Sequence, residues 1–69
     1  MLIPKIRKWR IQFLLAGATV AEGVFSAMFA ALARDEAEMA LRFQNDRVRA
    51  GEIPGVVVEN YDTVSMTAL

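Results

Sequence analysis

Residues 11–33 form a run of 23 residues in which Glu22 is the only formally charged side chain, and this run limits the folds open to the chain. A helix of that length spans about 34 Å, which exceeds the roughly 30 Å hydrocarbon core of a bilayer. Gln12, Thr19 and Ser26 dilute the apolar character of the run. The run therefore predicts a helix that either crosses a membrane or is buried among protein neighbours.

Basic side chains gather before this run, and residues 1–10 contain no acid. The flank consists of Lys5, Arg7, Lys8, Trp9 and Arg10. Basic residues with an interfacial tryptophan are typical of the end of a membrane span, and the positive-inside rule then predicts a cytoplasmic N-terminus. The same side chains suit the phosphates of lipid or nucleic acid. The cluster is short, however, and lacks the extended basic face of a nucleic-acid binder, which argues against nucleic acid as a partner.

Small or weakly polar residues recur along one face of the predicted helix. We expect these residues to form the helix-packing face: Ala16, Gly17, Thr19, Gly23, Ser26 and Ala30. Small residues at such spacing let two helices approach closely. A simple alanine-rich helix with a partly solvated stripe has the same pattern, so the specific seam and the solvated stripe both remain open.

Glu22 lies at the edge of this face. An ionised carboxylate in an apolar setting is costly, so it is expected to be paired, protonated or near water. Three interpretations follow: an exposed glutamate on the polar edge of a helix, a buried acid that contacts a partner subunit, or a proton or cation site.

The segment "GATVAE" resembles the processing site of bacterial prepilins, in particular those of the tight-adherence group. In that family cleavage follows the glycine, here Gly17, and the glutamate, here Glu22, guides the stacking of mature subunits. The resemblance covers about six residues. Five mostly apolar residues, "IQFLL", separate the basic flank from "AG", and only about eleven apolar or small residues follow Glu22, so the chain departs from the family pattern at both ends.

Residues 34–50 also have helical character, with acids near their start and Arg47 and Arg49 near their end. Gly51 and Pro54 supply a stop. No turn signal separates this segment from the apolar run. The predicted fold class is therefore all-α: one long helix over about 5–50, straight or bent near Gly23 or Arg34, that does not form an independent globular fold.

Residues 51–69 are rich in β-branched residues, and apolar and hydroxyl side chains alternate with a period of two over 63–68. They predict an extended C-terminal arm that adds to a sheet edge or lies along a neighbour. The residues expected to dock are Val56, Val57, Val58, Tyr61, Val64 and Met66. The alternative is an extended tail without a dedicated docking role.

The chain offers little for catalysis or cofactor binding. Its 69 residues include no cysteine and no histidine, and no acid has a plausible base beside it. A chain of this size also struggles to build a self-sufficient core, which makes other protein subunits or a lipid bilayer the expected partners. We therefore expect no enzymatic activity, no cofactor, no metal and no small-molecule substrate.

Two functions stay open from the sequence. The first is a small accessory subunit of a membrane complex with a single span and a cytoplasmic N-terminus. The second is a structural protein of a virus particle or filament, in which many copies of a long helix bundle and the C-terminal arm docks on a neighbour. A pilin-like subunit of an extracellular filament is a third, lesser alternative.

Overall fold

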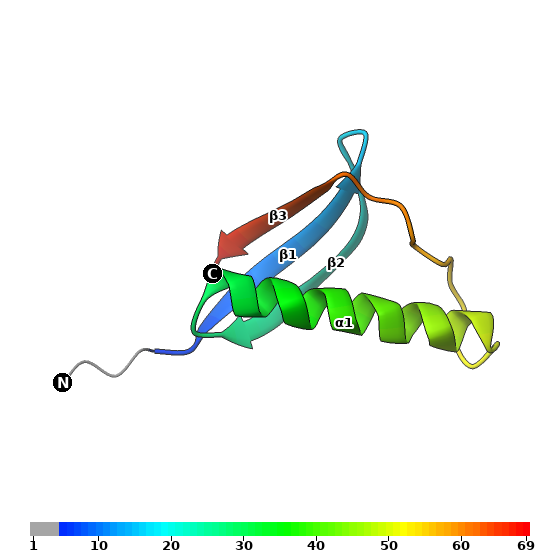
Figure 1. The fold of residues 1–69 in the computed structure, drawn as a ribbon, viewed down its shortest axis with the longest axis horizontal. Coiled ribbons are helices and arrows are strands. Elements are labelled where there is room, and N and C mark those ends of the chain that lie inside the picture. The colour runs from blue at the N-terminus through cyan, green and yellow to red at the C-terminus, as the bar shows by residue number, and fades with distance from the viewer. Residues whose placement is uncertain (1–4) are drawn as a thin grey trace.

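A computed structural model describes residues 5–69, which form a three-stranded antiparallel sheet with one helix across one of its faces (Figure 1). The elements are β1 (Arg7–Leu15), β2 (Ala18–Ala27), α1 (Ala30–Arg49) and β3 (Thr63–Ala68). The strand order is β2-β1-β3, so the first strand is central. The prediction of an all-α chain with one long helix over 5–50 is therefore wrong.

The apolar run is divided because β1 has the alternation of a half-buried strand. Ile11 and Phe13 are buried beneath the helix, whereas Lys8, Arg10 and Gln12 lie on the opposite face of the sheet. A period of two places the charged and amide side chains in solvent, which a helix over the same residues would not do. The long run reflects two neighbouring strands and the start of α1, not one continuous helix.

A two-residue turn joins the first two strands. Ala16 and Gly17 both have positive φ, 51° and 82°, and the flanking Leu15 and Ala18 are paired. Positive φ at both central residues is the geometry of a type I′ turn, whose twist matches that of the strands it connects. The register shifts beyond Phe13, so that Val20 has no opposite residue and forms a bulge in the edge strand β2.

The helix α1 packs on the sheet through a stripe that recurs every fourth residue. Its buried members are Ala33, Ala37, Leu41 and Asn45. The alanines allow the helix axis to approach the sheet closely at its N-terminal half, over Ile11 and Phe13. In the last turn Arg47 and Arg49 complement the helix dipole, and Gly51 follows with a φ of 75°.

The C-terminal segment returns to the same molecule. After α1 the chain crosses to the far end of the sheet, and β3 pairs antiparallel with β1 (Figure 1). Just before β3, Tyr61 packs edge-on against Phe13 with ring centroids 4.8 Å apart. The molecule is thin, with principal extents of 48 × 27 × 15 Å, as expected for one sheet and one helix. Because each layer is covered on one side only, large surfaces of both layers face solvent.

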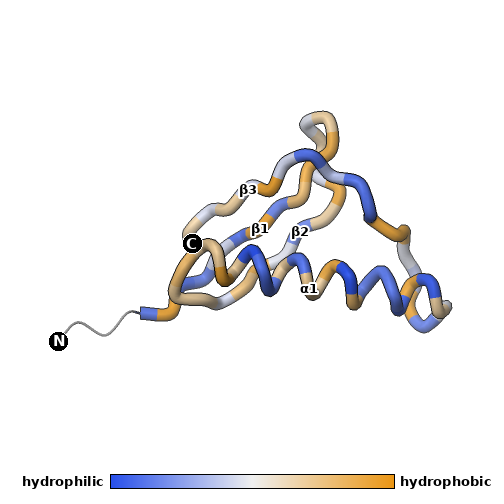
Figure 2. The backbone as a smooth tube through the Cα atoms, viewed as in Figure 1, coloured by the Kyte–Doolittle hydropathy of each residue, from blue (hydrophilic) through white to orange (hydrophobic). Residues whose placement is uncertain are grey.

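The helix does not fit a membrane. Within 5–69 no helix is long and apolar enough to cross a bilayer. Figure 2 shows the reason, since hydrophilic residues recur along the whole length of α1. The prediction of an α-helical, single-pass membrane subunit with a cytoplasmic N-terminus is therefore wrong.

Candidate protein interaction surface

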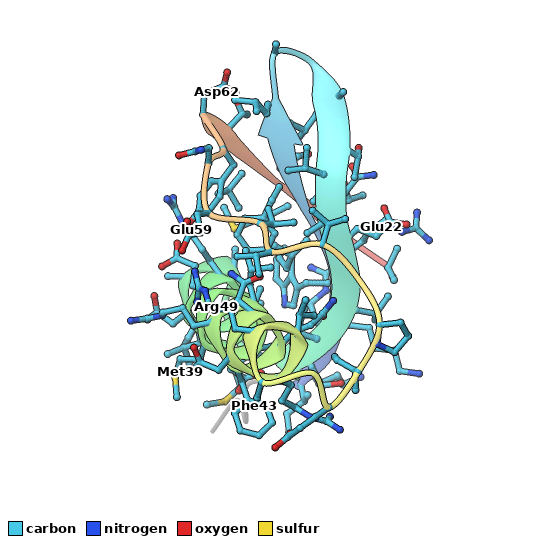
Figure 3. The ribbon with its side chains drawn as sticks, turned by 90° about the vertical axis from the view of Figure 1, so that its right-hand side faces the viewer. Glu22, Met39, Phe43, Arg49, Glu59 and Asp62 are labelled. Atoms are coloured by element: carbon cyan, nitrogen blue, oxygen red, sulfur yellow. The ribbon has the colours of Figure 1, made fainter. Side chains whose placement is uncertain are left out.

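The solvent-facing side of α1 carries large apolar side chains. Leu32, Met39 and Phe43 are 45%, 65% and 67% exposed. They are seven and four residues apart, a spacing that returns to the same face of a helix. Figure 3 shows Met39 and Phe43 projecting away from the sheet. We refer to Leu32, Met39 and Phe43 as the apolar stripe.

The apolar stripe lies on the side of the helix opposite the core. Residues 33, 37 and 41 face the sheet, and at about 100° per residue Met39 lies roughly half a turn from their mean direction. The large apolar residues of 34–50 are Met39, Leu41, Phe43 and Val48. The structure separates them, because Leu41 is buried in the core while Met39 and Phe43 are not. The helical period is enough to separate Met39 from Leu41, because residues two apart lie about 200° apart around the helix axis.

Charges of both signs border the apolar stripe. Asp35 and Glu36 lie toward the N-terminal half of α1, and Arg42 and Arg47 toward its C-terminal half. Arg47 pairs with Glu52 at 3.4 Å, but both side chains are well exposed. An exposed ion pair of this kind contributes little to stability, so Arg47 remains available to another acid.

The residues predicted to form a small helix face lie in the β-hairpin. Ala16 and Gly17 form the turn, Thr19, Gly23 and Ser26 belong to β2, and Ala30 begins α1. No helical seam exists at these positions. Gly23 has a local role, because a Cβ atom there would lie 2.8 Å from the ring of Phe25, which covers the glycine on the helix side of the sheet.

Glu22 lies on the open face of the sheet. Its Oε2 accepts a hydrogen bond from Nε2 of Gln12, the residue directly opposite on β1, at 2.8 Å. The carboxylate is exposed (Figure 3), so it does not need a buried counter-ion. A contact between Glu22 and a partner subunit stays a prediction.

The basic flank enters the sheet instead of a helix. Lys5 precedes β1, and Lys8 and Arg10 are exposed on the open face. The guanidinium of Arg7 lies 5.5 Å from the ring centroid of Trp9, within the range of a cation–π contact. The Trp9 indole N–H donates to the carbonyl of Ala27 at 3.1 Å, which ties the start of β1 to the end of β2.

The predicted docking arm is divided between a loop and a strand. Val56, Val57 and Val58 lie in the loop before β3, Tyr61 packs on the core, and Val64 and Met66 belong to β3. The arm thus adds to the edge of its own sheet. Its further docking on a neighbour stays a prediction.

Asp62 holds the hairpin turn to the start of β3. Its Oδ2 accepts the Ala16 N–H at 3.1 Å, and its Oδ1 accepts the Thr63 hydroxyl at 3.0 Å. The hydrogen bond from the Ala16 backbone N–H, and then the one from the Thr63 hydroxyl, lower the pKa of Asp62 below its ordinary value of 3.8, because both stabilise the ionised carboxylate. These two hydrogen bonds connect the hairpin turn to the start of β3.

An open groove of about 600 Å³ lies between the second half of α1 and the following loop. Charged residues of both signs line it, and Arg49 forms an ion pair with Glu59 (Figure 3). In the part of the chain that the structure describes, no three His, Cys, Asp or Glu side chains come together to hold a metal. Arg49 also pairs with Asp46 at 3.5 Å, and the side chains of both ion pairs are exposed.

Comparison with known proteins adds no further constraint. No protein family, no curated protein and no solved structure matches this chain. Among the surfaces of residues 5–69, the apolar stripe sets three large apolar side chains in line on the solvent side of one helix.

Proposed function

We propose that this chain is a non-enzymatic structural subunit that assembles with other copies of itself through the apolar stripe on α1. The observation that carries the proposal is the exposure of Leu32, Met39 and Phe43 on the side of the helix that the sheet does not cover. Three large apolar side chains in line on a solvated helix favour a second helix laid along them.

A second copy fits the apolar stripe when the two helices run antiparallel. If Met39 of one copy lies beside Phe43 of the other, Asp35 of the first comes level with Arg47 of the second, and Glu36 comes level with Asp46. The two-fold symmetry of such a contact repeats this arrangement at the other end of the seam. Arg47 of each copy therefore lies near acids of the other copy at both ends of an apolar seam.

The expected affinity is modest. Six partly exposed side chains, three from each copy, contribute about 5–10 kcal/mol of gross burial at the usual value per side chain. Association itself costs about 4–15 kcal/mol in lost rigid-body freedom. The two terms are similar, so we expect association through the apolar stripe to depend strongly on protein concentration and to be abolished by a charge in this seam.

Sedimentation velocity over a wide range of concentrations tests the proposal. The wild-type chain is expected to gain mass through this seam as its concentration rises, and the double variant Met39→Glu/Phe43→Glu is expected to lose that gain. Ala31→Glu is the matched control, since it adds a charge to an exposed position of α1 outside the apolar stripe. A double variant that associates as well as the wild type would contradict the proposal.

A further inference from the structure

The outer edge of β3 presents backbone groups to solvent. Leu69 donates its N–H to the Lys8 carbonyl at 2.9 Å, and β3 continues in the same register with Thr67 opposite Arg10. In an antiparallel ladder alternate residues direct both backbone groups to the same side. The odd-numbered residues of β3 therefore bond β1, and Val64, Met66 and Ala68 direct their N–H and C=O groups outward.

The two edges of the sheet differ in how they are protected. On β2 the bulge at Val20 and the charge of Glu22 interrupt the edge. On β3 the sequence "TVSMTA" contains no charge, no proline and no bulge. Charges, prolines and bulges are the features that keep edge strands from pairing with other chains, and β3 lacks all three.

The side-chain pattern of β3 is complementary to itself. When two such strands run antiparallel about Met66, Val64 of one faces Ala68 of the other, and Ser65 faces Thr67. Apolar side chains then meet on the helix-covered side of the sheet and hydroxyl side chains on the open side. No like charges oppose each other, and no side chain changes face.

We infer that β3 pairs antiparallel with β3 of a second copy, centred on Met66, and so joins two three-stranded sheets into one sheet of six strands. About six ladder hydrogen bonds would form between the outward backbone groups of Val64, Met66 and Ala68 and those of their mates. We assign a second copy to this edge because two β3 strands match on both faces of the sheet, apolar side chains with apolar and hydroxyl side chains with hydroxyl. An unrelated strand would match both faces only by chance.

The inference extends the proposed function, since it adds a second contact between copies at a different site. The apolar stripe lies on the outward side of α1, and the β3 edge lies at the side of the sheet. Each contact has its own two-fold axis, so the two together link copies beyond a dimer, as a structural assembly requires. The strand contact does not depend on the helix contact and is testable without it.

Disulfide trapping tests the strand contact, because the chain has no cysteine of its own. Met66→Cys is placed in the Met39→Glu/Phe43→Glu background, which removes the helix contact. At the two-fold axis the Cα atoms of residue 66 and its mate lie about 5.5 Å apart, within disulfide range. We expect most of the chain to become a covalent dimer under mild oxidation, with circular dichroism unchanged.

Ser65→Cys in the same background is the matched control. It is one residue from the axis, so the two cysteines are out of register by two residues and lie beyond the roughly 7 Å limit for a disulfide. At least tenfold faster crosslinking at 66 than at 65 supports the inference. Equal rates, or no crosslinking at 66, overturn it whether or not the helix contact exists.

A second measurement avoids reliance on the disulfide. Met66→Pro removes an N–H that β1 does not use, so the fold is expected to persist while pairing at the edge is blocked. In the Met39→Glu/Phe43→Glu background, the remaining rise in sedimentation mass should disappear in the proline variant. Association that survives Met66→Pro in a folded protein would contradict the strand contact and leave the helix contact unaffected.

Discussion

Asn45 on α1 and Val58 in the following loop exchange two hydrogen bonds. Asn45 Nδ2 donates to the Val58 carbonyl at 2.8 Å, and the Val58 N–H donates to Asn45 Oδ1 at 2.9 Å. The side-chain amide thus satisfies both backbone groups of one residue, as a neighbouring strand would. Because Asn45 is only 6% exposed, this pair anchors the loop to the helix and directs the chain toward β3.

Asn45→Ala is expected to destabilise the fold by about 2–3 kcal/mol, since it leaves the N–H and C=O of Val58 without partners in a partly buried setting. Urea unfolding followed by circular dichroism measures the change. Gln44→Ala is the control, because the neighbouring side chain is exposed and alanine has the higher helix propensity. A loss below about 0.5 kcal/mol for Asn45→Ala would show that water replaces the amide at no cost.

Two parts of this fold, the C-terminal end of α1 and the strand β3, are predicted by local patterns in the sequence. The C-terminal end of α1 is marked by Arg47, Arg49 and Gly51, and the structure ends the helix at Arg49. The alternation over 63–68 coincides with β3. Both signals are local, since dipole complementarity and strand periodicity act within a few residues.

The sequence does not predict the hairpin, because the length of the apolar run is a stronger signal than the alternation of side chains within β1. Ile11 and Phe13 alternate with Arg10 and Gln12 where the apolar run begins, but the run is long enough to predict a membrane span. The turn lacks the usual asparagine or aspartate before its glycine, and the bulge at Val20 interrupts the period of two along β2. Both features hide the hairpin from a reading of the local pattern.

The candidate interaction surface is also only partly predictable from the sequence. Met39 and Phe43 attract attention as apolar residues of an otherwise charged helix, but the sequence does not say which face of α1 meets the sheet. That choice depends on the alanines at 33 and 37, whose small size permits close packing on the sheet. The β3 edge is not predictable from the arm alone, because its free side is defined only once the other side pairs with β1.

The backbone of the hairpin turn is strained at Ala16, and a substitution there can relieve the strain. Ala16 has a φ of 51°, a region that costs an L-residue with a Cβ atom about 1 kcal/mol. Ala16→Asn is expected to raise stability by about 0.5–1 kcal/mol, because asparagine tolerates this conformation and is preferred before glycine in a type I′ turn. Gly17→Ala, at a φ of 82°, is expected to lower stability by about 1 kcal/mol. Denaturant unfolding that moves both variants in the same direction would contradict the turn assignment.

Asp62 is expected to make stability depend on pH. Its pKa is lower in the folded chain than in the unfolded chain because Ala16 and Thr63 donate to the ionised carboxylate. Folding therefore favours the charged form, so the contribution is fully present above the ordinary value of 3.8 and is lost as the pH falls below it. Asp62→Asn should be less stable than the wild type at pH 7, and the difference should shrink toward pH 2.5. A difference that grows on acidification would show that the sign is wrong.

Replacing the exposed apolar residue at the N-cap of α1 with a capping residue is expected to stabilise the first turn of the helix. Phe29 is the N-cap, with an extended backbone at φ −131° and ψ 149° and no capping hydrogen bond from its side chain. A serine fits this geometry and accepts from the free N–H groups of the next turn, so Phe29→Ser should stabilise the chain by about 1 kcal/mol. Phe29→Ala removes the same exposed ring without adding a cap, and it should show no such gain in thermal or urea unfolding. Equal stability of the two variants would mean that solvent already satisfies these N–H groups as well as a hydroxyl does.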